Sequence, residues 1–181
     1  IEIQSFANDN SLEIEEVEAL TRSPDEFAAH IREAVEERDV EFVMIDGIVG
    51  YRQGLRGDDS TEALTRELHA LCRYLKRMGI TVVLIDEVQY VTGEFSPSAH
   101  HISYLADNII FLRYLETDGR LEKAIGVLKK RYGDFENSLR TLAIDPEAGL
   151  QVGEPLSGYQ GILTGIAKSV DQPTDDQTWN E

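Results

Sequence analysis

A compact basic cluster, Lys129, Lys130 and Arg131, follows a strand-like run in a chain that is otherwise strongly acidic. Lysine and arginine together are the usual side-chain partners of phosphate, because lysine supplies a point charge and arginine a planar fork of donors. The cluster therefore predicts an anion site at a strand end, and phosphate is the most common anion of this class. The alternative is that the three side chains are ordinary solvated residues.

Three carboxylates come at the ends of short apolar runs. Asp46 ends the run EFVMID at residues 41–46, and Asp86 and Glu87 follow ITVVLI at residues 80–85. In parallel α/β sheets, ligands bind at the carboxyl ends of the strands, where a carboxylate can hold a Mg²⁺-bound water beside a triphosphate. Strand-end carboxylates also cap the turns that follow them, and the sequence leaves both possibilities open.

These side chains need strands and helices to position them, and the apolar spacing predicts both. Residues 41–46 and 80–85 have the composition of strands that are buried on both faces of a parallel sheet. Residues 24–38 follow a capping serine and begin with proline, and residues 58–78 carry leucines at helical spacing before Gly79. The order of strand, helix and strand predicts a parallel crossover unit.

The second half of the chain predicts antiparallel strands. Strand-like runs cover residues 108–115, 123–129 and 139–144, after a short helix-like piece at residues 102–106. The Asp118-Gly119 pair between two of these runs is a hairpin signal. Near the N-terminus, residues 12–17 alternate apolar and acidic side chains and predict an edge or half-buried strand. We therefore expect an α/β fold with a mostly parallel sheet flanked by helices and an antiparallel β-hairpin extension.

The net charge of −17, from 34 acidic and 17 basic residues, is large for a chain of 181 residues. It opposes binding to nucleic acid phosphates, so we do not expect nucleic acid as a partner. A cytosol rich in salt would screen the self-repulsion, since the Debye length falls to roughly 3 Å at 1 M. We interpret the charge as halophilic adaptation, with an ordinary acidic interaction surface as the alternative.

Signals for a membrane or for secretion are missing from the sequence. No uninterrupted apolar run approaches the roughly 20 residues of a membrane span, and the N-terminus does not resemble a signal peptide. The single Cys72 excludes a disulfide framework, which fits a reducing, cytoplasmic setting. We expect a partial domain at residues 1–166 and a polar, disordered tail at residues 167–181. Because the first residue is Ile1, we also expect the chain to start inside a larger protein.

A phosphate cradle is also missing. A P-loop needs Gly, four residues and then Gly-Lys followed by Ser or Thr, and no such string occurs between Ile1 and Glu181. Residues 161–169 come nearest, but Lys168 stands three residues after the glycine instead of directly after it. The His100-His101 pair has no second ligand cluster at metal spacing, so we do not expect zinc.

Five strings, in this order, resemble the second half of a KaiC-type domain of the RecA-like ATPase superfamily. They are VMIDG (43–47), ELHALCRYLKRMGITVVLIDE (67–87), HISYLADNIIFLRYLE (101–116), KAIGVLKKRYGDFENSLRTLAI (123–144) and GLQVGEPLSGYQGILTG (149–165). The most specific parts are LADNII, KAIGVLKKR and DFENSLR. The resemblance covers residues 12–165 and implies a RecA-like partial domain that lacks the half with the P-loop.

The family implies a hexameric ring with ATP and Mg²⁺ bound between subunits. By similarity, Asp46 matches the Walker B aspartate, and Lys129 and Arg131 match a Lys-x-Arg pair that reaches a neighbour's γ-phosphate. Members of the circadian-clock type autophosphorylate adjacent serine and threonine in a His-Ile-Ser-Thr string. Ser103 matches that serine, but Tyr104 replaces the threonine, which argues against a two-site phosphorylation cycle.

Two classes of function follow. In the first, the chain is part of an ATPase or autokinase in signal transduction and is inactive alone, with Asp86 and Glu87 near the nucleotide or merely capping their strand. In the second, it is a non-catalytic regulatory or oligomerisation module of the same fold that binds a protein partner. DNA strand exchange through pore residues such as Arg52 and Arg56 is disfavoured by the net charge and by the acidic residues that follow directly.

Overall fold

The computed structural model describes residues 11–18, 21–48, 60–87, 104–117, 119–157, 159–160 and 168–169. The chain divides into two compact units. Unit 1 comprises Ile1–Val88 with Ser98–Leu105, and unit 2 comprises Gln89–Pro97 with Ala106–Glu181. No helix among the described residues is long and apolar enough to cross a membrane.

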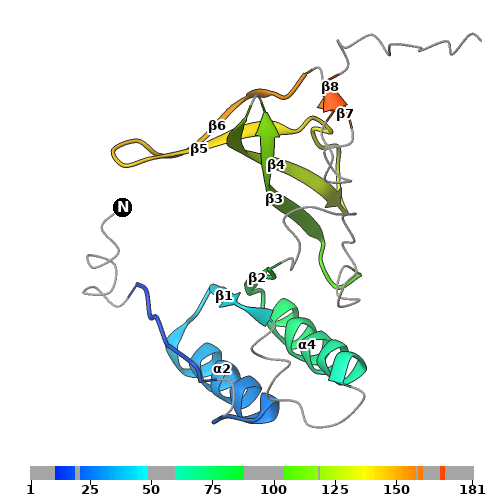
Figure 1. The fold of residues 1–181 in the computed structure, drawn as a ribbon. Helices are drawn as coiled ribbons and strands as arrows, with labels where there is room; N and C mark the ends of the chain where they lie inside the picture. Colours follow the sequence, from blue (N-terminus) through cyan, green and yellow to red (C-terminus); the bar gives the residue numbers. More distant parts are fainter. Residues whose placement is uncertain are drawn as a thin grey trace, which may run out of the picture. The chain divides into compact units, whose positions relative to one another are not determined.

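Unit 1 contains the predicted strand, helix and strand. Strands β1 (Phe42–Asp46) and β2 (Thr81–Ile85) are parallel and pair in register, from Phe42 opposite Thr81 to Asp46 opposite Ile85. Helices α2 (Pro24–Arg38) and α4 (Ser60–Arg77) lie beside them (Figure 1). The parallel crossover predicted from the sequence is therefore confirmed.

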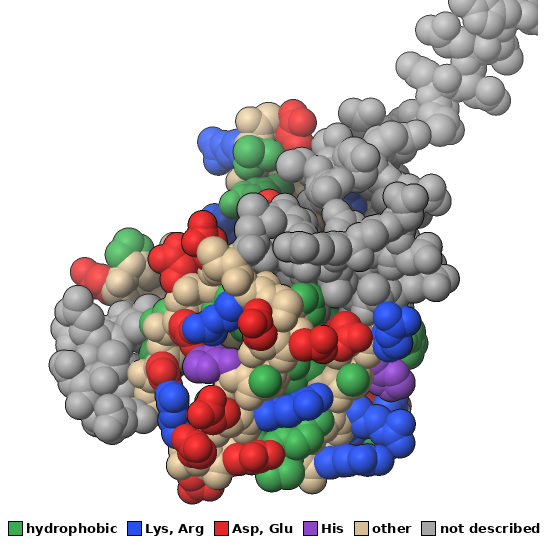
Figure 2. Space-filling model, turned by 90° about the horizontal axis from the view of Figure 1, so that it is seen from below, with side chains coloured by type: hydrophobic (Ala, Val, Ile, Leu, Met, Phe, Trp, Pro, Cys, Tyr) green, Lys and Arg blue, Asp and Glu red, His purple; other side chains and the backbone are tan. Residues whose placement is uncertain are grey.

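Helix α2 begins where the sequence predicts because its first turn is capped on both sides. The Ser23 Oγ accepts a hydrogen bond from the Glu26 backbone N at 3.2 Å, and the Glu26 carboxylate accepts one from the Ser23 backbone N at 2.8 Å. Pro24 occupies the first helical position, where no backbone donor is needed. The helix ends at Asp39, whose φ of 53° turns the chain toward β1. Charged side chains cover the outer side of the helical layer (Figure 2).

The core of unit 1 lies between the two helices and one face of the strand pair. Its buried members are Ala28, Ile31, Val35, Ile45, Leu71 and Leu75, with Val43, Val82 and Leu84 packed against them. The opposite face of β1 carries Phe42 and Met44, which are 51% and 56% exposed. The prediction that these strands are buried on both faces is therefore wrong for the described residues, because both helices pack on the same face.

The strand predicted at residues 12–17 is also wrong. The segment at residues 11–18 is not assigned to any strand, and Ile14 is 71% exposed. Its acidic side chains instead contact basic side chains of α2 and the turn before it: Glu15 contacts Arg22 at 2.7 Å and His30 at 2.5 Å, and Glu13 pairs with Arg38. The alternation of acidic and apolar residues reflects ion pairing with a helix rather than a half-buried strand.

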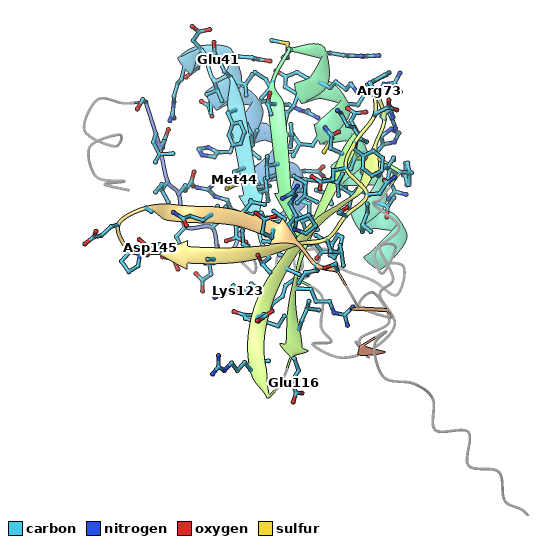
Figure 3. All side chains as sticks on the ribbon, turned by 90° about the horizontal axis from the view of Figure 1, so that it is seen from above. Glu41, Met44, Arg73, Glu116, Lys123 and Asp145 are labelled. Atoms are coloured by element: carbon cyan, nitrogen blue, oxygen red, sulfur yellow. The ribbon has the colours of Figure 1, made fainter. Side chains whose placement is uncertain are left out.

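Unit 2 is an antiparallel sheet. Four strands follow one another in chain order, β3 (Asn108–Thr117), β4 (Arg120–Lys130), β5 (Arg140–Asp145) and β6 (Gly149–Pro155). The predicted hairpin is confirmed by the pairing of β3 with β4, but the antiparallel part is larger than predicted because β6 adds a fourth strand. Glu116 lies near the tip of the first hairpin, and Asp145 lies where β5 turns into β6 (Figure 3).

One face of this sheet carries the core of unit 2. Leu115 and Ala124 are buried and pack with Leu139 and Leu156. Gly126 lies opposite Phe111, so close that a Cβ at this position would come within 2.5 Å of the Phe111 ring. Only glycine fits there without movement of the ring.

A short strand pair follows the sheet. β7 (Tyr159–Gln160) pairs with β8 (Lys168–Ser169) in antiparallel fashion. The residues of β8 fall in the segment for which a disordered tail is expected, and residues 170–181 of that segment lie outside the described part of the chain.

Candidate functional site

The carboxyl edge of the β1–β2 pair brings together the three predicted strand-end carboxylates. Asp46 ends β1 directly opposite Ile85, the last residue of β2, and Asp86 and Glu87 follow at once. All three acidic residues are exposed. Because the strands are parallel and in register, their carboxyl ends share one edge of the sheet, as the sequence predicts.

The chain after Asp46 holds that residue at the edge. Gly47 has a φ of 82°, and its backbone N donates to the Ile85 carbonyl at 3.2 Å. Ile48 then turns inward and is completely buried against Leu68. A buried anchor two residues later thus fixes the strand end, while the Asp46 carboxylate stays in solvent.

The exposed carboxylates at this edge are of the ligand type that Mg²⁺ binds. Mg²⁺ usually takes one or two protein carboxylates and completes its octahedron with water and phosphate oxygens. In the part of the chain that the structure describes, no group of three or more His, Cys, Asp or Glu side chains could hold a metal ion. The described carboxylates at this edge therefore do not form an all-protein metal site, and a single exposed carboxylate is compatible only with Mg²⁺ whose other ligands come from water and phosphate.

The basic cluster lies at the corner where β4 ends in unit 2. Lys130 is the last residue of β4, and its Nζ donates to the Asp134 carbonyl at 2.9 Å. Arg131 follows, and its Nη1 lies 2.7 Å from Asp107 Oδ1. The Arg131 backbone N also donates to the Asp107 carbonyl at 2.8 Å. Arg131 is thus held at two points by one residue.

A β-bulge precedes the cluster and changes the face on which Lys129 lies. Ile110 pairs with Val127, whereas Ile109 pairs with Lys129, so Leu128 is an extra residue in β4. Residues directly opposite in an antiparallel ladder share a face, which places Lys129 on the face of Ile109 and not on that of Val127. Lys129 is accordingly partly buried at the end of the core face, whereas Arg131 lies beyond the strand and is exposed. Sequence reasoning did not predict this bulge.

The comparisons with known proteins decide the family. The family described as ATPase: KaiC matches residues 1–157 of the chain. The chain belongs to the KaiC ATPase family. The resemblance read from the sequence is therefore confirmed.

Several KaiC proteins are similar to this chain. Circadian clock protein KaiC3 of Synechocystis sp. is 33% identical over 95 residues, which are 52% of this chain and 19% of that protein. The circadian clock oscillator protein KaiC of Thermostichus vulcanus is 27% identical over 135 residues, 74% of this chain and 25% of that protein. The KaiC of Synechococcus elongatus is 25% identical over 123 residues, 68% of this chain and 23% of that protein. The chain thus spans about a fifth to a quarter of the length of these relatives.

The KaiC-like string around Ser103 is described only in part. Ser103 lies outside the described residues, as do His100 and His101. Tyr104, which replaces the family's threonine, is 51% exposed and packs edge-on against His69 with ring centroids 5.9 Å apart. The aromatic side chain at this position thus has a ring contact that a threonine could not make.

Two residues of the KaiC-like string DFENSLR form a structural link that sequence reasoning did not predict. The Arg140 Nε donates to both Glu136 carboxylate oxygens, at 2.9 and 3.0 Å, and its Nη1 donates to the Gly153 carbonyl at 2.9 Å. The hydrogen bond with Glu136 raises the pKa of Arg140. The Glu136–Arg140 pair joins the loop before β5 to β6. The four-residue spacing of these opposite charges was the sequence signal that could have indicated the contact.

Proposed function

We propose that this chain supplies the Walker B carboxylate and a trans-acting cation pair to a KaiC-like, RecA-superfamily ATPase, with ATP and Mg²⁺ as cofactors. The observation that carries the proposal is the shared carboxyl edge of β1 and β2, where Asp46 stands in a chain of the KaiC ATPase family. In parallel α/β sheets this edge is where nucleotides bind. Asp46 would contact the metal, and Asp86 and Glu87 would stand near the nucleotide.

In this proposal Lys129 and Arg131 act on a nucleotide held by a neighbouring subunit. Both lie at the end of β4, and the side chain of Arg131 is 40% exposed, so a second molecule can reach it. Cations that reach a γ-phosphate from another subunit stabilise the charge that develops during phosphoryl transfer. The setting is a cytoplasmic homo-oligomeric ring, a hexamer, in which each site needs two subunits, and ATP turnover or autophosphorylation serves signalling.

The phosphate cradle lies outside this chain in the proposal, since the sequence contains no P-loop string. The 181 residues alone are therefore expected not to hydrolyse ATP. Ser103 remains the proposed phosphorylation position, matched to the family's serine.

The double substitution Lys129→Ala with Arg131→Ala tests the trans-acting pair. In the complete encoded protein, we expect kcat for ATP hydrolysis to fall by about 10²-fold or more, with nucleotide affinity retained, because the pair acts on the transferring phosphoryl group. Turnover is measured by phosphate release and affinity by calorimetry. Lys76→Ala with Arg77→Ala, which removes two exposed cations from the end of α4, is the matched control. Wild-type turnover in the first variant would refute the assignment.

A non-catalytic regulatory or oligomerisation module is the second candidate. The observation that favours it is an apolar face of the unit 2 sheet, on which Ile110, Leu112 and Tyr114 are 62%, 64% and 51% exposed. Exposed apolar patches on a sheet mark protein–protein contacts. This candidate predicts that ATP changes neither the mass nor the melting temperature of the complete protein, whereas the first predicts that ATP changes both.

A further inference from the structure

The ladder between β3 and β4 determines the face of the sheet on which Lys129 lies, but it ends before Arg131. Lys129 is paired with Ile109, so the strand fixes the face of the sheet from which its side chain leaves the backbone. The last pair of the ladder joins Asn108 to Lys130, and Arg131 follows the strand end. An arginine side chain has several rotatable bonds, so a residue beyond the ladder needs another partner to hold it in one direction.

Asp107 provides that partner. It precedes Asn108 as Arg131 follows Lys130, so the two residues face each other one step beyond the ladder. The Asp107 carbonyl accepts from the Arg131 backbone N at 2.8 Å, and its Oδ1 lies 2.7 Å from Arg131 Nη1. The backbone hydrogen bond fixes the main chain of Arg131, and the ion pair keeps its guanidinium beside the Asp107 carboxylate.

We propose that Asp107 is a positioning residue for Arg131, holding the guanidinium in the direction in which it reaches a neighbour's phosphate. The inference rests on the proposed trans-acting role of Arg131. A guanidinium carries five N–H donors in a rigid fork, so it can contact a carboxylate through one nitrogen and a phosphate through others.

Stability is a poor explanation for this ion pair. The side chains of Arg131 and Asp107 are 40% and 33% exposed, and solvent at such partly exposed side chains weakens the contribution of an ion pair to stability, although the Asp107 Oδ1 itself is buried. The orientation of the Arg131 guanidinium does not depend on the net free energy that the ion pair contributes to folding. A contact that barely changes the melting temperature can still restrict the rotamers of a catalytic arginine.

Asp107→Asn is the test, because it removes the charge and keeps the size and the backbone carbonyl. In the complete encoded protein, we expect kcat for ATP to fall about tenfold with an unchanged KM and a melting temperature close to that of the wild type. Asp107→Asn combined with Arg131→Ala is expected to be no slower than Arg131→Ala alone, since Asp107 acts only through Arg131. Asp134→Asn, which removes a neighbouring charge but keeps the carbonyl that Lys130 contacts, is the matched control.

The outcomes separate this inference from the function on which it rests. Wild-type turnover in Arg131→Ala overturns both. A slow Arg131→Ala with a fast Asp107→Asn, or a double variant much slower than Arg131→Ala, overturns the positioning role alone. If Asp107→Asn does not fold, Asp107→Glu moves the carboxylate by one methylene, and an unchanged kcat in that variant again overturns the positioning role.

Discussion

Glu15 contacts two basic side chains at once, and these contacts change its pKa. One carboxylate oxygen lies 2.7 Å from Arg22 Nη1 and the other 2.5 Å from His30 Nε2. The hydrogen bond with His30 is the main cause that lowers the pKa of Glu15 below its ordinary value of 4.5, and the contact with Arg22 acts in the same direction. These contacts tie the segment at residues 11–18 to α2 and the turn before it.

Folding stability should therefore depend on the ionisation of Glu15. A carboxyl whose folded-state pKa is lowered stabilises the protein above its unfolded-state pKa, and this contribution is lost as the pH falls through the lower folded value. We expect Glu15→Gln to lower the free energy of unfolding at pH 7 and the difference from the wild type to shrink below about pH 4.5. Urea unfolding from pH 7 to pH 3 measures this, with the exposed neighbour Glu16→Gln as control. Parallel curves at all pH values would contradict the prediction.

At the scale of elements, α4 is the main apolar support of unit 1. Its residues Leu68, Leu71 and Leu75 are fully buried and face β1, β2 and α2. Leucines at spacings of three and four residues form one stripe on a helix, which is why sequence periodicity predicted this helix so well. Leu68 of the same stripe packs against Ile48, and this contact fixes the strand end at which Asp46 stands.

Shortening a leucine of this stripe should lower the stability of unit 1. We expect Leu71→Ala to lower the free energy of unfolding of unit 1 by about 2–5 kcal/mol, because it leaves a cavity in a closed core. Leu121→Ala is the control, since Leu121 is 72% exposed and its truncation should change stability by less than about 0.5 kcal/mol. Denaturant titration of both variants gives the comparison, and equal losses would show that α4 is not packed as described.

At the scale of the whole molecule, the net charge of −17 sets how the protein responds to salt. The described acidic residues that have cationic partners include Glu13, Glu15, Asp107 and Glu136, but acidic residues outnumber basic ones by 34 to 17. Self-repulsion therefore exceeds attraction in the folded chain. We propose that the charge is an adaptation to high salt.

Raising the salt concentration should stabilise the protein. Between about 0.1 M and 1 M the Debye length falls from roughly 10 Å to roughly 3 Å, which screens most repulsion between exposed carboxylates. We expect the melting temperature to rise over this range of KCl, and to rise less in a variant with Glu33→Gln and Glu37→Gln on the exposed side of α2. A melting temperature that falls with salt would show that ion pairs outweigh the repulsion.

Local patterns predicted the local features of this fold. The capping serine and the leucine stripe indicated the helices, the apolar runs indicated β1 and β2, and the Asp-Gly pair indicated the hairpin. The features that sequence reasoning missed depend on contacts between distant residues. The segment at residues 11–18 pairs with a helix, β6 finds its place against β5, and the faces of β1 differ because both helices pack on one side.

The candidate site also combines features that could be predicted from local sequence with features that depend on contacts between distant residues. The placement of Asp46, Asp86 and Glu87 at one edge could be predicted, because parallel strands that begin together end together. The contact of Arg131 with Asp107 could not, because it joins residues 24 positions apart across a ladder whose register was unknown. The adjacent apolar residues Val127 and Leu128 were the only local sign of the bulge.

That bulge determines on which face of the sheet Lys129 lies. Side chains alternate along a strand, so the face of a residue depends on whether an odd or an even number of positions separates it from a fixed point. With Leu128 present, Lys129 shares the face of Ile109. If Leu128 were paired in a regular ladder instead, it would stand opposite Ile109 and Lys129 would lie on the opposite face of the sheet, although every charge in the chain would be unchanged.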